Sequence, residues 1–147
     1  MNARPVNAEV VQRRLEEMHA LLGYLRTRED VTPADLRADI EVRLAVERAL
    51  AQLVDHATSV NAHIVSGAGA LPSADYRSSF HDAAQHGLIS EELAERLAPA
   101  AGLRNVLTHE YVRVDLERVA AAVGDATRDF GDYVREAAAF LRTLRRE

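Results

Sequence analysis

Apolar residues recur at intervals of three and four through most of this chain, the spacing of helices that bury one face. No β-branched or aromatic run alternates with a period of two, and no Asn-Gly pair marks a hairpin. The first regular set predicts a helix over roughly residues 7–28. Its apolar positions are Val11, Leu15, Met18, Leu22 and Leu25.

A second helix is expected to begin at Thr32. Thr32 precedes Pro33, and Asp35 follows three residues after Thr32, so the segment has an N-cap, a proline at the first helical position and an acid in the first turn. The apolar pattern predicts that this helix continues to about Val65. Such a helix is about 50 Å long, and its apolar face is wide enough to contact more than one neighbour. We therefore expect a subunit interface along it.

Shorter segments follow. The stretch SGAGALPS (66–73) predicts a loop, after which Ser73 is expected to cap a short helix that ends near Gly87. Ser90, followed by two glutamates, is expected to open another helix. Pro99 should kink or break that helix, because proline has no amide hydrogen to donate.

The last helix is expected to begin at Asp115, which serves as its cap. Its apolar residues keep a three-four spacing to the end: Leu116, Val119, Val123, Ala126, Phe130, Tyr133, Ala137, Phe140 and Leu144. A repeat of this kind is typical of the seam of a helix bundle. The pattern predicts an all-α, up-and-down bundle of four to five helices, forming a single domain over residues 1–147.

Composition narrows the possible functions. The chain has 147 residues, no cysteine and a net charge of −5, and all 18 of its basic residues are arginine. The acidic balance argues against broad, nonspecific nucleic-acid binding but leaves room for a small phosphate site. The chain has no apolar run long enough to span a membrane and no apolar core of a signal peptide near its start, so we expect a cytoplasmic protein with no membrane partner.

Candidate chemistry lies in the stretch LRNVLTHEYVRVD (103–115), where Arg104, His109 and Tyr111 fall within eight residues. A histidine can take and give a proton near neutral pH, and an arginine can bind a phosphate and stabilise the charge that develops on it. Together they could deprotonate a ribose 2′-hydroxyl and cleave RNA without a metal ion. Acid and base are both needed, and a two-fold dimer would supply two histidines and two arginines.

Structural explanations of the same residues stay open. Near the end of a helix, an arginine often balances the helix dipole, a histidine often caps the last turn, and a tyrosine often packs against its neighbours. His63 could face a cleft or act as a packed or capping side chain, and Asp55 could orient an arginine or be solvated. The spacing of the other histidines does not favour a shared metal ion, and we expect neither metal nor cofactor.

The motif reads Arg-x4-His-x-Tyr, and its surroundings resemble the HepT-like branch of the HEPN superfamily. The resemblance runs from DIEVRLAVERALAQLVDHATSVNAHIV (39–65) through DYRSSFHDAAQHGLISEELAERLAPAAGLRNVLTHEYVRVDLERV (75–119) to the C-terminal helix. It implies a homodimeric toxin that is a metal-independent ribonuclease with its active site in the dimer cleft.

The resemblance also implies residue roles. Arg104 would bind and stabilise the scissile phosphate, His109 would be the acid and base, and Asn105 would be a supporting polar neighbour. The implied partner is an MntA-like nucleotidyltransferase antitoxin that neutralises the toxin by transferring AMP to Tyr111. The alternative is a noncatalytic helical binding module that docks a minimal nucleotidyltransferase.

Overall fold

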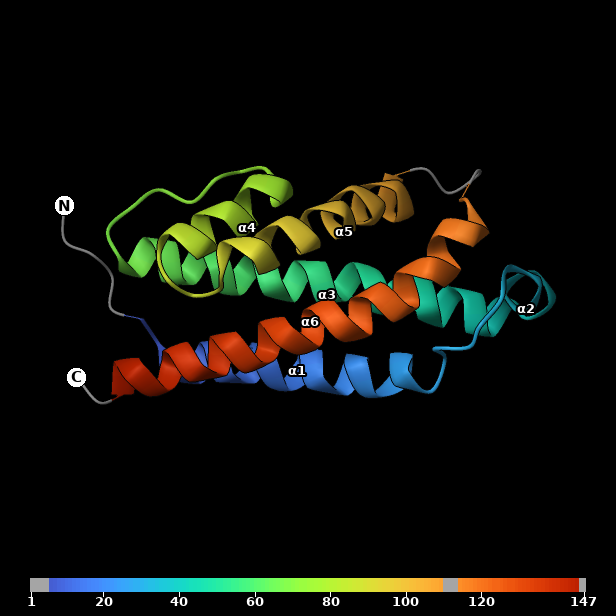
Figure 1. The fold of residues 1–147 in the computed structure, drawn as a ribbon, viewed down its shortest axis with the longest axis horizontal. Helices are drawn as coiled ribbons and strands as arrows, with labels where there is room; N and C mark the ends of the chain where they lie inside the picture. Colours follow the sequence, from blue (N-terminus) through green and yellow to red (C-terminus); the bar gives the residue numbers. More distant parts are fainter. Residues whose placement is uncertain (1–5, 110–113, 146–147) are drawn as a thin grey trace.

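The protein is described by a computed structural model that covers residues 6–109 and 114–145. This part of the chain contains six helices and no strand (Figure 1), so the predicted all-α class is confirmed with more helices than the four or five expected. The helices are α1 (Ala8–Arg26), α2 (Pro33–Ala38), α3 (Ile40–Gly67), α4 (Tyr76–Gln85), α5 (Glu91–His109) and α6 (Leu116–Arg145).

The four long helices lie along one axis and alternate in direction. In Figure 1, α1 and α6 lie side by side along one edge, while α4 and α5 cover α3 along the other. The short α2 occupies the end of the molecule where the chain turns from α1 into α3. Helix α3 contacts every other helix, so it is the central element on which the rest of the bundle is built.

The expected single helix between Thr32 and Val65 is wrong, because the chain breaks at Asp39. This residue has extended backbone angles (φ −129°, ψ 99°), and its carboxylate accepts hydrogen bonds from the backbone amides of Glu41 and Val42, at 3.1 and 3.3 Å. Asp39 therefore ends α2 and caps α3, since a short carboxylate satisfies the free amides of a new helix. The capping box predicted at Thr32 and Asp35 is confirmed at the start of α2.

The cap of α4 also differs from the expectation. Asp75, rather than Ser73, is the N-cap, and its carboxylate accepts from both the amide and the hydroxyl of Ser78, at 3.0 and 2.8 Å. These bonds lower the pKa of Asp75. Ser73 instead donates its amide to Asp82. The preceding loop lies two residues later than expected, because α3 continues through Gly67 and α4 begins at Tyr76.

Helix α5 carries the candidate motif near its end. Ser90 accepts from the amide of Leu93 at 3.1 Å, so the predicted start is confirmed. Pro99 does not end the helix, which runs without a break to His109. The expected cap of the last helix is confirmed as well, because the amide of Glu117 donates to Asp115 at 3.0 Å.

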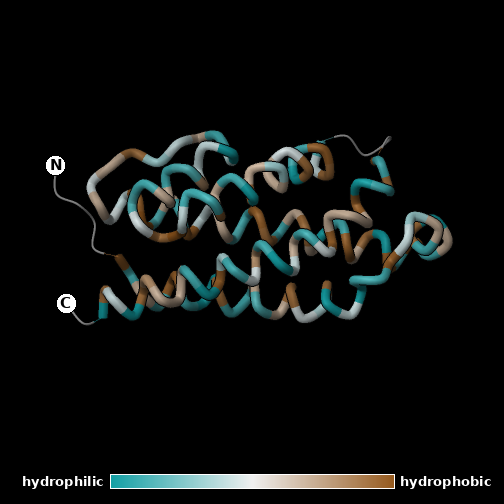
Figure 2. The backbone as a smooth tube through the Cα atoms, in the orientation of Figure 1, coloured by the Kyte–Doolittle hydropathy of each residue, from teal (hydrophilic) through white to brown (hydrophobic). Residues whose placement is uncertain are grey.

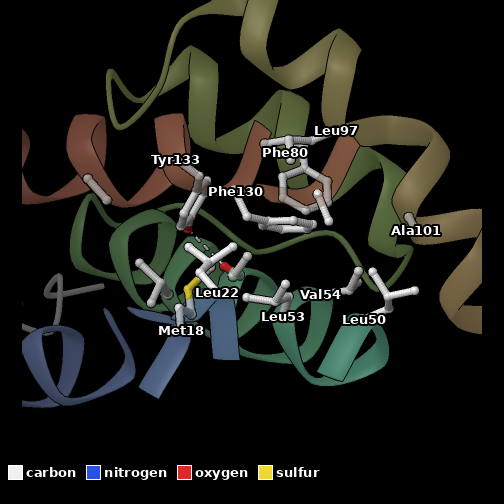
Figure 3. Packing of buried hydrophobic residues seen from close by; sticks show 14 of the residues in the cluster. Met18, Leu22, Leu50, Leu53, Val54, Phe80, Leu97, Ala101, Phe130 and Tyr133 are labelled. Carbon is white, nitrogen blue, oxygen red and sulfur yellow. Dashed lines mark hydrogen bonds between the residues drawn. The ribbon is translucent and has the colours of Figure 1, made fainter. Parts of the chain in front are cut away.

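The core lies between these helices and is mostly aliphatic. The hydropathy along the backbone changes from turn to turn on each helix, as expected for helices with one buried face (Figure 2). Three aromatic rings from α4 and α6 meet edge to face at the centre, with centroids 6.3–6.5 Å apart (Figure 3). They belong to Phe80, Phe130 and Tyr133, and they pack on α3 residues such as Leu53 and Val54.

One polar network crosses this core. The hydroxyl of Tyr133 lies 2.6 Å from Oδ1 of Asn61 and 3.0 Å from the carbonyl oxygen of Ala57, and the amide of Asn61 donates to Ser79 at 3.1 Å. Burial raises the pKa of Tyr133 well above its ordinary value, so the phenol keeps its proton as a donor. The network joins α6, α3 and α4, because each of these helices contributes one of its side chains.

None of the helices within residues 6–109 and 114–145 combines the length and the hydrophobicity needed to cross a lipid bilayer.

The buried network predicts the effect of removing one hydroxyl. Tyr133→Phe leaves acceptors on α3 without a donor in a dry environment, and should lower the free energy of unfolding by about 1–3 kcal/mol. Urea denaturation followed by circular dichroism measures this change. Tyr24→Phe is the matched control, since the Tyr24 hydroxyl donates to no described residue. Equal stability of the two variants would contradict the role of the network.

Candidate functional site

Arg104 lies on α5 and is held by two contacts from other helices. Its Nε donates to Oδ1 of Asp55 on α3 at 2.9 Å, and its guanidinium carbon lies 4.6 Å from the centroid of the Tyr76 ring on α4. The side chain of Arg104 is 15% exposed and that of Asp55 is 42% exposed. Asp55 therefore orients an arginine while its carboxylate stays partly solvated, which combines the two interpretations that the sequence left open.

These contacts leave part of the guanidinium free for a ligand. Nε is occupied by Asp55, whereas Nη1 and Nη2 of Arg104 donate to no acceptor within the described residues. Stacking on Tyr76 restrains the guanidinium plane. An arginine whose two terminal amino groups are free and whose orientation is set in advance is well suited to bind a phosphate through two parallel hydrogen bonds.

An open groove of about 460 Å³ lies beside this arginine, and we name it the Arg104 groove. It is formed by side chains of α1, α3 and α5 together with α4 and the loop before it. Its lining residues are Arg14, Asp55, Thr58, Ser59, Ala62, Ser73, Ala74, Asp75, Tyr76, Ser79 and Arg104. The groove is lined by two guanidinium groups, several hydroxyls and one aromatic ring. This combination can bind an anionic ligand that also carries hydroxyl groups.

Arg14 is the second arginine of the groove, and it was not predicted from the sequence. Its Nη1 lies 3.1 Å from Nδ1 of His56 on α3. Because a guanidinium can only donate, His56 accepts through Nδ1 and is neutral in this contact. Burial, followed by the charge of Arg14, lowers the pKa of His56, which favours the neutral ring. No local sequence motif marks this pair, since its members are 42 residues apart.

The other residues singled out from the sequence lie along α5 or after it. Asn105 is exposed on the helix, and His109 is exposed at its last residue. Tyr111 lies outside the described residues. Arg104 and His109 are five residues apart, about 140° around a helix, and no hydrogen bond joins them. The described part of the chain brings Arg104 together with Asp55 and Tyr76, and leaves His109 facing solvent.

His63 has a structural role, because its side chain caps a helix. Its Nε2 accepts from the backbone amide of Asn7 at 2.9 Å, so it caps the start of α1. This contact supports the capping alternative for His63 over a place in a cleft. Within residues 6–109 and 114–145, no three histidine, aspartate or glutamate side chains lie close enough together to hold a metal ion.

A second cavity, of about 250 Å³, lies between α5 and α6 and is lined mainly by apolar side chains. Four arginines line it, Arg96, Arg104, Arg118 and Arg128, and two of them bond to the same buried carboxylate. Arg96 donates to Asp129 at 2.6 Å, and Arg128 donates to the same residue at 2.9 Å. Asp129 is buried, and its ion pair with Arg96 joins α5 to α6, whereas Arg128 is its neighbour on α6. Polar groups make up a larger share of the lining of the Arg104 groove, so the groove is the better-equipped site for an anion.

Comparison with known proteins identifies the family of this chain. Residues 10–137 match the sequence model of the family described as HepT-like, ribonuclease HepT-like. The chain is 32% identical over 146 residues to a tRNA nuclease HepT of Aphanizomenon flos-aquae, covering 99% of this chain and 97% of that protein. It is 29% identical over 100 residues to an mRNA nuclease HepT of Shewanella oneidensis, covering 68% and 72% of the two chains.

Solved structures share the fold. The tri-AMPylated HEPN toxin of Shewanella oneidensis, solved in complex with an MNT antitoxin, superposes with a TM-score of 0.78 at 21% identity, covering 95% of this chain and 99% of that chain. The cytosolic protein YutE of Bacillus subtilis, of unknown function, superposes with a TM-score of 0.80 at 14% identity, covering 95% and 93%. The family match over most of the sequence and the full-length relative show that this chain belongs to the HepT-like ribonuclease family.

Proposed function

We propose that this protein is the toxin of a toxin–antitoxin pair and cleaves RNA with Arg104 and His109, without a metal ion. Two relatives are named as nucleases of tRNA and mRNA, which supports RNA as the substrate class. The main support for the proposal is the way in which neighbouring side chains hold Arg104 beside the groove. Asp55 and Tyr76 restrain it beside an open polar groove, and within residues 6–109 and 114–145 its two terminal amino groups have no acceptor, which suits them to bind a phosphate.

The proposed reaction is transesterification within the RNA strand. His109 takes the proton of a ribose 2′-hydroxyl, the O2′ atom attacks the adjacent phosphorus, and the bond from phosphorus to the O5′ of the next nucleotide breaks. A protonated histidine returns a proton to that O5′, so that charge and atoms balance. Arg104 binds the phosphate oxygens and stabilises the additional negative charge of the pentacoordinate state.

A homodimer supplies the second proton-transfer group. One chain offers one histidine in this motif, whereas the reaction needs a base and an acid at the same time. His109 is exposed at the end of α5, where a second copy of the chain could approach it. A two-fold axis beside this helix end would bring two His109 and two Arg104 side chains to one strand. Asn105, exposed next to Arg104, is proposed as a supporting polar contact to the same phosphate.

Neutralisation is proposed to occur at Tyr111, two residues after His109. A nucleotidyltransferase antitoxin of the MntA type would transfer AMP to its hydroxyl. The phosphates of AMP groups so close to the active site would repel the phosphates of RNA and occupy its path. The structurally similar Shewanella toxin is described as tri-AMPylated and bound to an MNT antitoxin, which supports this form of regulation.

A noncatalytic module that docks a nucleotidyltransferase is the second candidate, and the net charge of −5 favours it over a nucleic-acid enzyme. A docking module has no use for a proton-transfer group, so the two candidates differ in what His109 does.

His109→Ala should lower the rate of RNA cleavage by at least about 100-fold, because general acid–base catalysis by a positioned side chain contributes this much or more. Cleavage of labelled RNA by the purified protein, with and without EDTA, measures the effect. Wild-type activity should survive EDTA. Cleavage that stops with the chelator would contradict the metal-free mechanism, and cleavage by neither protein would favour the docking module.

Tyr111→Phe should retain cleavage but escape neutralisation, because the acceptor oxygen for AMP is gone while the groups proposed for catalysis remain. Incubation with ATP and the nucleotidyltransferase, followed by mass spectrometry, shows the modification. Tyr76→Phe serves as the control, since it removes a different tyrosine hydroxyl near the site. AMP found on the Tyr111 variant as readily as on the wild type would refute the assignment.

Asp55→Ala should reduce cleavage about 10- to 100-fold, since loss of an orienting partner misplaces a catalytic side chain. Its free energy of unfolding should fall by about 1 kcal/mol or less, because the carboxylate is partly solvated. Paired measurements of cleavage rate and urea denaturation separate the two effects. A large loss of stability with unchanged cleavage would show that the ion pair serves the fold alone.

A further inference from the structure

The Arg104 groove contains a cation for which the proposed reaction has no role. Arg14, on α1, lines the groove together with Arg104. Asp55 already neutralises Arg104. No carboxylate within the described residues forms an ion pair with Arg14, whose contact is with the neutral ring of His56. Arg14 is therefore the source of uncompensated positive charge on this groove, in a protein whose net charge is negative.

The two arginines are fixed by neighbouring residues of one helix. Asp55 and His56 follow each other on α3, and they hold Arg104 from α5 and Arg14 from α1. Each contact uses one nitrogen of the guanidinium and leaves others without a described partner. Helix α3 thus positions one guanidinium group from α1 and one from α5 on the same groove. Two cations in one groove are suited to bind a ligand that carries two linked anionic groups.

The remaining lining fits a nucleotide chain. The hydroxyls of Ser59 and Ser73 line the groove and make no hydrogen bond to a described residue, so they are free to bind ribose or phosphate oxygens. Asp75 is the other carboxylate of the lining, and it is already bonded to the amide and hydroxyl of Ser78. Asp75 is the N-cap of α4, whereas Arg14 belongs to α1.

We propose that Arg14 forms a second phosphate subsite for the RNA substrate, and that the Arg104 groove holds a strand by two of its phosphates, the scissile one at Arg104 and a neighbouring one at Arg14. The subsite rests on the proposed function for its substrate. His56 acts as a positioning residue, because its ring fixes Arg14 and does not touch the RNA. The site favours single-stranded RNA, whose flexible backbone can place two of its phosphates at two fixed guanidinium groups.

The test compares two neighbouring arginines on one helix. Arg14→Gln and Arg13→Gln remove the same charge, and Arg13 is exposed and does not line the groove. Each substitution is combined with His109→Ala, so that the RNA stays intact while its affinity is measured. Two probes are used, a single-stranded hexanucleotide with several phosphates and a dinucleotide with one internal phosphate.

Arg14→Gln should weaken hexanucleotide binding about tenfold and reduce the slope of log affinity against log salt by about one, as expected for the loss of one phosphate contact. The loss for the dinucleotide should be several-fold smaller. Arg13→Gln should bind the hexanucleotide nearly as the His109→Ala parent does. Equal losses for the two arginines, or equal losses for the two probes, would overturn the subsite.

Two further controls keep the outcome interpretable. If Arg14→Gln does not fold, His56→Ala takes its place and must weaken hexanucleotide binding more than dinucleotide binding. Cleavage of RNA by His109→Ala would contradict the proposed function; the binding of the Arg14 and Arg13 variants is then compared with 2′-O-methyl RNA of the same two lengths, which has no 2′-hydroxyl to attack. Failure of the catalytic proposal and failure of the subsite are therefore separate results.

Discussion

The ion pair between Arg104 and Asp55 is the interaction on which the site depends. It joins α5 to the central helix α3 through a single 2.9 Å hydrogen bond and uses only the Nε of the guanidinium. Stacking on Tyr76 restrains the rest of the group. Because Asp55 is partly solvated, the pair contributes little to stability. Its consequence is geometric. A side chain with considerable rotational freedom is held in one orientation, and its two terminal amino groups bond to none of the residues that the structure describes.

The bundle makes this orientation possible. Helix α3 contacts all other helices, and the network of Tyr133, Asn61 and Ser79 fixes its position relative to α4 and α6 through buried hydrogen bonds. The same helix presents Asp55 and His56 to the groove. Helix α3 therefore serves both folding and recognition, because one of its faces packs in the core and another presents two orienting side chains. The core supplies the stability that the partly solvated site does not.

Patterns of apolar residues and caps predicted the fold better than the site. The capping box at Thr32 and the cap at Asp115 depend on residues within one turn, so they could be predicted from the sequence. The caps at Asp39 and Asp75 were missed, because several serines and aspartates compete locally and tertiary packing selects among them. Arg104 was singled out by its motif, and Asp55 was a candidate for orienting an arginine. That these two residues pair could not be decided from the sequence, because local spacing carries no information across 49 residues.

The central claim is that Arg104 keeps its bond to Asp55 while its free amino groups bind RNA. Nuclear magnetic resonance of the arginine side chains, recorded as single-stranded RNA with 2′-O-methyl groups is added, tests it directly, because this RNA cannot be cleaved through a 2′-hydroxyl. The Nη signals of Arg104 should shift on binding, and its Nε signal, with its hydrogen bond to Asp55, should remain protected from exchange. Unchanged Nη signals at saturating RNA, or loss of the protected Nε signal, would contradict the account.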